Sequence, residues 1–177
     1  MGLRSALRAL FGTSRSNPQL PVEIGPNGAV ARAELSEGDF RLEVVGESRY
    51  QDVLERIVGG RSEDGANYPT MAILLPEPEN RYDPNAVQVL IAGLVVGYLS
   101  RANARVMHRP LMHFMARHDR AFACRALIKG GWDRGPDDRG HFGVELCLEP
   151  ADLGVSDDQL RGARDPAFLE SVIEFEP

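Results

Sequence analysis

Cysteine is scarce in this chain, since only Cys124 and Cys147 occur among 177 residues and no C-x-x-C spacing is present. A zinc ribbon requires paired thiolates at such spacings, so that class of metal site is excluded. Lysine is scarcer still, because Lys129 is the only lysine among 20 cationic residues. No apolar run approaches the roughly 20 residues of a membrane helix. We therefore expect a cytoplasmic protein with no stable membrane association, in which both cysteines are reduced apolar fillers.

The net charge of −6 is unevenly distributed along the chain. Residues 41–150 carry a net charge of −1, whereas residues 151–177 carry −5. Within 101–125 there are six arginines against a single acid, Asp119. The six are Arg101, Arg105, Arg109, Arg117, Arg120 and Arg125. A basic patch is thus available inside a mildly acidic protein, as contact with nucleic-acid phosphates requires.

Composition divides the chain into three parts. Residues 12–38 are rich in Gly, Pro, Asn and Ser, and residues 1–39 are therefore predicted to form a flexible N-terminal arm with at most short extended pieces. Residues 40–150 hold the regular apolar patterns and predict one folded domain. Residues 151–177 form an acidic C-terminal tail, with one short helix near 166–173 and otherwise solvated.

Alternation of apolar and polar residues predicts six strands within 40–150. They are a strand of about six residues from Phe40, then 68–75, 86–91, 94–99, 120–129 and 141–148. Ala92-Gly93 predicts a tight hairpin turn between the third and fourth of these strands. Two or three short helices are inserted between strands rather than alternating with them. This order predicts an α+β fold with a small, strongly bent, barrel-like sheet.

The helices carry recognisable start and stop signals. Ser48 with Gln51 three places later matches a capping box, and Gly59-Gly60 ends that helix. Its predicted apolar face consists of Val53, Leu54, Ile57 and Val58. Ser100 predicts the cap of a second helix, and Pro110 predicts the start of a third.

The connection at 76–90 reads P-E-P-E-N-R-Y-D-P-N-A-V-Q-V-L and is unusually polar and rigid. The D-P-N sequence is a turn signal, which predicts a stiff turn held by Asn80, Asp83 and Asn85. Tyr82 has two interpretations. Its ring either covers the mouth of the barrel or offers a flat face on which a nucleobase stacks, a contact worth about 1–3 kcal/mol.

The charged groups around this loop suggest a strand terminus rather than a backbone groove. Asp83 would repel a phosphate but could accept a hydrogen bond from a free sugar hydroxyl. Arg49 and Arg101 each follow a serine at a predicted helix start, where the helix dipole disfavours cations. Helix N-termini bind anions, so a bound phosphate would compensate the unfavourable interaction of these arginines with the helix dipole. The alternative interpretation is that both are solvated surface arginines.

Three segments together resemble the HIRAN domain family. They are GESRYQ (46–51), PEPENRYDPNAVQV (76–89) and VGYLSR (96–101). The order of strand, short helix, strand, N-x-Y-D-x-N-A-V loop and V-G-[YH]-L hairpin is similar to that family over roughly 40–150. The resemblance implies a modified OB-like or SH3-like barrel that captures the 3′ end of single-stranded DNA. Because no Walker loop or RING finger is present, the chain resembles the family's free-standing members.

The resemblance also implies roles for the loop residues. Tyr82 looks like the base-stacking tyrosine, and Asp83 looks like the acceptor for the 3′-hydroxyl. Asn80 resembles a polar contact in the same pocket, whereas Asn85 holds the loop. The implied partners are single-stranded DNA and a helicase or other repair protein, in repair or replication-fork processing.

Outside the loop, four further positions correspond to the family's site, and one of them departs from its pattern. Tyr98 stands where the family often has His or Tyr, and Arg101 falls where a cation can meet a terminal phosphate. At residues 48–50 this chain has Ser-Arg-Tyr, whereas the family's end-binding members have Arg-Tyr-Tyr. The two positions concerned are Arg49 and Tyr50. Arg49 thus replaces one aromatic of the stacking pair, and a guanidinium can also stack on a base.

Catalysis is not expected from this sequence. Glu77, Glu79 and Asp83 could in principle hold a divalent cation, but the prolines between them favour a structural cluster. We expect no metal and no cofactor. The leading interpretation is a non-enzymatic nucleic-acid-binding module, and the alternative is a protein-interaction or scaffolding module on the same barrel.

Overall fold

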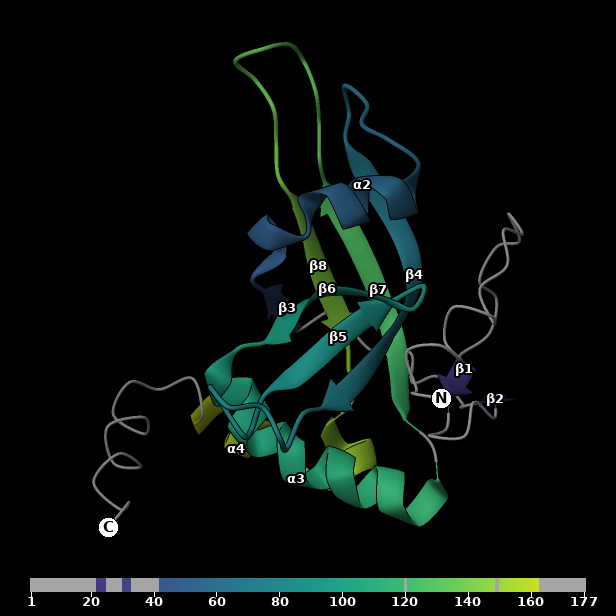
Figure 1. The fold of residues 1–177 in the computed structure, drawn as a ribbon, viewed down its shortest axis with the longest axis vertical. Coiled ribbons are helices and arrows are strands. Elements are labelled where there is room, and N and C mark those ends of the chain that lie inside the picture. Colours follow the sequence, from purple (N-terminus) through teal and green to yellow (C-terminus); the bar gives the residue numbers. More distant parts are fainter. Residues whose placement is uncertain (1–21, 25–29, 33–41, 120, 149, 163–177) are drawn as a thin grey trace.

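The computed structural model describes residues 22–24, 30–32, 42–119, 121–148 and 150–162. Six antiparallel strands close into a barrel in the order β3-β6-β5-β4-β7-β8 (Figure 1). Their bounds are β3 Leu42–Val45, β4 Ala66–Pro76, β5 Val87–Ile91, β6 Leu94–Leu99, β7 Phe122–Gly130 and β8 Phe142–Cys147. The predicted α+β fold with a small six-stranded barrel is confirmed.

The barrel core follows from strand alternation. Along β4, Ala72 and Leu74 point inward and are fully buried, while Ile73 joins a second apolar cluster on the outer side. All five residues of β5 are buried, including Gln88, the one polar residue among them. Burial also raises the pKa of the Cys124 thiol to about 12, so this cysteine is an unreactive filler as expected.

Two glycine positions allow the barrel to close. Ala92 and Gly93 both have positive φ, 51° and 74°, which confirms the tight turn between β5 and β6. At Gly97, in β6, an added Cβ would lie 2.4 Å from Val44 Cγ1 and 2.7 Å from Val45 O. The V-G-Y-L sequence therefore needs glycine because β3 and β6 approach closely there.

Helices lie toward the two ends of the barrel (Figure 1). The 3-10 turn η1 (Glu47–Arg49) and helix α2 (Gln51–Val58) follow β3, and α3 (Arg101–His118) follows β6 at the other end. Leu54 is fully buried and Val53, Ile57 and Val58 pack against the core, so the predicted apolar face of α2 is confirmed. Gly59, at φ 91°, ends α2 as expected.

The predicted capping box at α2 is wrong. Ser48 lies within η1, and Tyr50 occupies the N-cap position without a side-chain bond. The Gln51 side chain instead pairs with the backbone of Phe142 in β8, donating to its O at 2.9 Å and accepting from its N–H at 2.8 Å. Gln51 is therefore used to fix α2 on the barrel.

The second helix differs from expectation at its centre. Ser100 caps α3, and its hydroxyl accepts from the Asn103 N–H at 3.3 Å, as predicted. Pro110 does not open a third helix but lies inside α3. Proline lacks an N–H, which costs one intrahelical bond. Packing of Met107 and Leu111, both fully buried, keeps the helix continuous across it.

Beyond the barrel the chain is less solvated than predicted. A 3-10 turn η2 (Pro150–Leu153) and a short helix α4 (Asp157–Gly162) lie against α3. Val155 is 3% exposed and joins the barrel core, which explains why this part of the acidic tail folds back. The helix expected near 166–173 lies outside the described residues.

Of the predicted arm, the structure describes two short extended pieces. Strands β1 (Val22–Ile24) and β2 (Val30–Arg32) pair antiparallel in a separate two-stranded sheet. Strand β1 lies against β7 and β4 of the barrel. In the part of the chain that the structure describes, no helix is both long and apolar enough to cross a membrane.

Candidate functional site

The loop between β4 and β5 is closed at its base by backbone hydrogen bonds. The Glu77 N–H donates to Ala86 O at 2.8 Å, which extends the β4–β5 ladder by one step. Two turns follow inside the loop, where the Asn80 N–H donates to Glu77 O at 2.9 Å and the Ala86 N–H donates to Asp83 O at 3.0 Å. The expected stiff turn is therefore present.

Asn80 organises the tip of this loop. Its Oδ1 accepts from the backbone N–H of Tyr82 at 3.0 Å and of Asp83 at 3.3 Å, while its Nδ2 donates to Glu77 Oε2 at 2.9 Å. Asp83 Oδ1 accepts from the Asn85 backbone N–H at 2.9 Å. Asn80 and Asp83 side chains therefore hold the turn, and the bond at Asn85 uses its backbone rather than its side chain.

Tyr82 projects away from the protein. Its side chain is 95% exposed, the highest value among the exposed large hydrophobic residues. A ring at that exposure cannot cover the mouth of the barrel, so the first of its two interpretations is excluded. Burying apolar surface is favourable, and an aromatic held out by a rigid loop offers a ready surface for a flat partner.

A buried polar relay connects the loop to the barrel. The Gln88 side chain, 4% exposed, donates to Glu77 Oε1 at 3.0 Å and lies 3.1 Å from the Tyr98 hydroxyl. Tyr98 in turn lies close enough to Tyr50 to act on its hydroxyl. Burial, followed by the neighbouring Tyr98, raises the pKa of Tyr50 above its ordinary value. Positions 50 and 98 are thus brought together, and both are tied to the base of the loop.

Sequence reasoning missed Glu77 and Gln88 as members of this group. The available signal was a single glutamine inside the apolar run V-Q-V-L-I, because a buried amide requires a partner. Its partner could not be read from the sequence, since Tyr98 belongs to another strand.

Asp83 faces helix α3. Its charge acts on His108, where burial lowers the pKa of the imidazole and Asp83 opposes that shift. His108 Nε2 is buried and has no hydrogen-bond partner among the described residues. Asp83 itself is half-buried, and among the described residues its Oδ2 accepts no hydrogen bond. One carboxylate oxygen is therefore engaged in the turn and the other is available.

The two arginines expected at helix starts are placed differently. Arg101 is the first residue of α3, directly after the capping Ser100, and is exposed. Arg49 is also exposed but ends η1, one position before the N-cap of α2. Arg49 is therefore outside the first turn of α2, contrary to the prediction, while remaining next to Tyr50.

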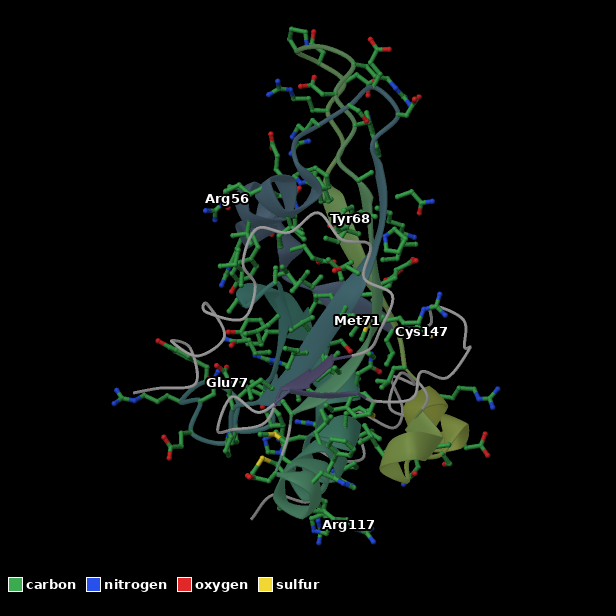
Figure 2. The ribbon with its side chains drawn as sticks, turned by 90° about the vertical axis from the view of Figure 1, so that its right-hand side faces the viewer. Arg56, Tyr68, Met71, Glu77, Arg117 and Cys147 are labelled. Atoms are coloured by element: carbon green, nitrogen blue, oxygen red, sulfur yellow. The ribbon has the colours of Figure 1, made fainter. Side chains whose placement is uncertain are left out.

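The remaining arginines of 101–125 do not gather in one patch. Arg105 and Arg109 line a cleft of about 470 Å³ between α3 and α4. Arg117 lies at the far end of α3 (Figure 2), and Arg125 lies on β7. Arg120 falls outside the described residues. Of the described arginines in 101–125, Arg101, Arg105 and Arg109 are the ones in the first part of α3.

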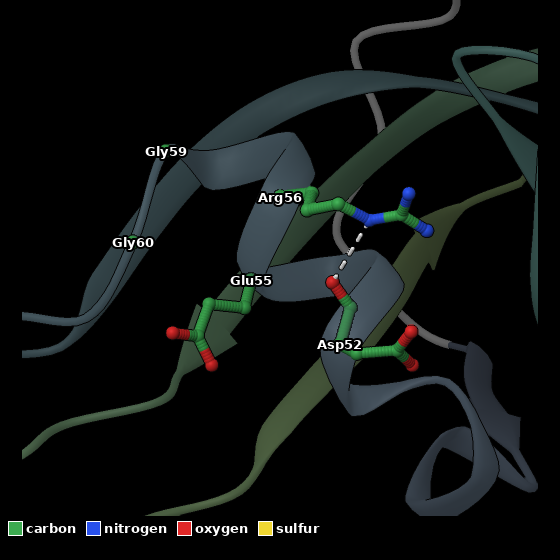
Figure 3. A pocket seen from close by; sticks show the side chains of 5 residues that line it. All are labelled: Asp52, Glu55, Arg56, Gly59 and Gly60. Carbon is green, nitrogen blue, oxygen red and sulfur yellow. Dashed lines mark hydrogen bonds between the residues drawn. The ribbon is translucent and has the colours of Figure 1, made fainter.

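A larger hollow of about 670 Å³ lies on α2, beside Asp52, Glu55 and Arg56. Figure 3 shows the two carboxylates pointing away from each other, with Arg56 Nε bonded to the Asp52 backbone O at 3.3 Å. Glu55 is already paired with Arg61 at 2.8 Å. These groups do not converge on a common point, so the hollow is a surface feature without a built site.

No group of three His, Cys, Asp or Glu residues in the described part of the chain could hold a metal ion. Within the loop, both carboxylate oxygens of Glu77 accept from amide groups, those of Asn80 and Gln88. Two of the three acids weighed from the sequence, Glu77 and Asp83, are therefore used to hold the loop.

The chain is similar to a known protein family and to a solved structure. A sequence model of the HIRAN domain matches residues 37–122. Among solved structures, the crystal structure of the HIRAN domain of human HLTF is similar at 18% identity, covering 82% of this chain and 94% of that one, with a TM-score of 0.38. No curated protein matches the chain by sequence.

Proposed function

Residues 37–122 belong to the HIRAN domain family, and from this premise we propose that the protein binds the 3′ end of single-stranded DNA through its β4–β5 loop. HIRAN domains are known generally as nucleic-acid-binding modules. The observation that carries the proposal is Tyr82, which is 95% exposed on a loop fixed by side-chain hydrogen bonds. Because the loop is already ordered in the folded protein, binding does not have to supply the free energy that would order it.

In this proposal the terminal base stacks on the Tyr82 ring. Stacking is available to every base because each has a π face, so the contact carries little sequence preference. Arg49, exposed beside the Tyr50–Tyr98 pair, supplies a second planar group that can stack on a base.

In this proposal Asp83 distinguishes a strand that ends in a 3′-hydroxyl from one that ends in a 3′-phosphate. Its free Oδ2 accepts a hydrogen bond from the 3′-hydroxyl, which is a charge-assisted contact. A terminal phosphate at the same place would bring two anions together and would lose that donor. The next phosphate along the strand meets Arg101 and the N-terminus of α3.

The preference for an end is tested by fluorescence anisotropy with two otherwise identical 5′-labelled oligonucleotides, one ending in a 3′-hydroxyl and one in a 3′-phosphate. We expect tighter binding of the 3′-hydroxyl form. Equal affinities for the two forms would refute end recognition while leaving strand binding. No binding of either form, together with a protein partner captured after nuclease treatment, would instead support a protein-interaction module.

The biological setting proposed is an accessory role in DNA repair or replication-fork processing. A barrel of this kind can hold a strand end but does not itself drive movement along DNA, so we expect it to act together with a helicase or another repair protein. Co-purification of such an ATPase that depends on an added 3′-hydroxyl strand is the expected result.

A further inference from the structure

Three arginines recur at a regular spacing on α3. Arg101, Arg105 and Arg109 are four residues apart, and all three are exposed. Since an α-helix turns every 3.6 residues and rises 1.5 Å per residue, they occupy one face and follow each other at about 6 Å along the axis. We call this row the α3 stripe.

The charges of the α3 stripe are not neutralised by acids. Among the residues that the structure describes, none of the three arginines forms an ion pair or a side-chain hydrogen bond. Long cationic side chains on protein surfaces are commonly paired in helices with acids three or four positions away. Here positions 97–113 contain no Asp or Glu at all. The stripe is therefore a continuous cationic surface open to an anion.

The outer part of the stripe borders a cleft. Arg105 and Arg109 line the hollow of about 470 Å³ that separates α3 from α4, with Val106 and Pro110 beside them. One acid, Asp158, also lines the cleft, and Arg161 lies 3.3 Å from its Oδ1 and compensates its charge. The cleft thus combines two unpaired guanidinium groups with a small apolar floor.

The stripe runs past the proposed end-binding site. Arg101 follows β6, which carries Tyr98, after the single residue Ser100, and His108, between Arg105 and Arg109 on the same helix, lies within the electrostatic reach of Asp83. Figure 1 shows α3 passing close to the β4–β5 loop, whereas in Figure 2 α4 lies on the other side of α3 from Glu77 at the base of that loop. A strand that reached the cleft would therefore pass around α3. A strand whose last nucleotide occupied the loop could therefore continue along α3.

We propose that the α3 stripe is a track for the sugar-phosphate backbone of the nucleotides that precede the 3′-terminal one, ending in the cleft between α3 and α4. This inference rests on the proposed function. Guanidinium groups bind phosphate oxygens in a bidentate manner and carry no base information. The track therefore adds affinity for longer strands without adding sequence preference.

The test compares two probes, a dinucleotide and a strand of about ten nucleotides, which lies within the site size of OB-like barrels. The variant is Arg105→Gln with Arg109→Gln, and the matched control is Arg117→Gln, an exposed arginine in the last turn of the same helix. Circular dichroism melts check that each variant is folded.

For the long probe we expect the double variant to bind about tenfold more weakly than the control. The slope of log K against log salt should also fall by about 1.4, since each phosphate contact on a single strand contributes about 0.7. Binding of the dinucleotide should be unchanged.

Two outcomes overturn the track while leaving the proposed function intact. One is a double variant that binds the long probe like Arg117→Gln. The other is an equal loss for both probes, which would place these arginines at the end site instead. Failure of the wild-type protein to bind either probe refutes the proposed function itself, and the track with it.

Discussion

Replacing Tyr82 by alanine separates a binding role from a structural one. Because the side chain is 95% exposed, its truncation removes almost no buried surface. At about 25 cal/mol per Å² of buried apolar area, the free energy of unfolding should change by no more than about 0.5 kcal/mol. The hydrogen bond at this residue uses its backbone N–H, which alanine retains.

Binding should respond very differently. Loss of one base-stacking ring costs about 1–3 kcal/mol, which corresponds to an affinity about 5- to 150-fold weaker. Tyr82→Phe keeps the ring and should retain most of the affinity. Tyr68, 39% exposed on β4 and well separated from Glu77 at the base of the loop in Figure 2, provides the control, since Tyr68→Ala should leave binding unchanged.

The assay is fluorescence anisotropy with a 3′-hydroxyl oligonucleotide at one fixed salt concentration, alongside thermal denaturation of each variant. Unchanged affinity for Tyr82→Ala would refute the stacking role. A marked fall in melting temperature with unchanged affinity would show that the ring has a structural contact that its exposure does not reveal.

Three other perturbations test the support of the site. Asn80→Ala removes three side-chain bonds within the loop, so chemical denaturation should show a loss of about 1–3 kcal/mol, with weaker oligonucleotide binding. Gly97→Ala places a Cβ 2.7 Å from Val45 O and should cost about 1–3 kcal/mol by the same measurement, whereas Gly143→Ala, with open space around its Cβ, should cost much less. His108 has a lowered pKa in the folded protein, so stability is full above the unfolded value of about 6.5 and declines as pH falls toward the folded pKa. The His108→Gln variant should flatten that decline in melting temperature, and an unchanged pH profile would count against burial of the imidazole.

The strands were predictable because their signals are local. Alternation and the A-G turn located β5 and β6 to within one residue, and the six-strand count implied the barrel. Helix boundaries were less predictable wherever a long-range contact competes with a local one. Gln51 could cap its own helix, but the backbone of Phe142 in β8 takes its side chain instead.

The same distinction applies to the site. The stiffness of the β4–β5 loop could be inferred from its proline, asparagine and aspartate residues. The exposure of Tyr82 could not, because exposure depends on how neighbouring elements pack around the loop. The relay from Glu77 through Gln88 to Tyr98 joins a loop and two strands, so no local sequence pattern predicts it.

The tail shows a further limit of composition. Its acidity suggested a solvated segment, yet Val155 supplies an apolar anchor that brings α4 against α3. One buried side chain can outweigh several surface charges, because exposed charges cost little in water whereas an exposed apolar side chain forgoes about 1.5–3 kcal/mol.

The most direct test of the account is an NMR titration of the isotopically labelled protein with a short 3′-hydroxyl oligonucleotide. We expect the largest amide shifts at Asn80–Asn85 and in the first half of α3, while the loops at the opposite end of the barrel, residues 59–65 and 131–141, remain unchanged. Shifts confined to that opposite end, or absent from the β4–β5 loop, would contradict the claim that this loop is the binding site.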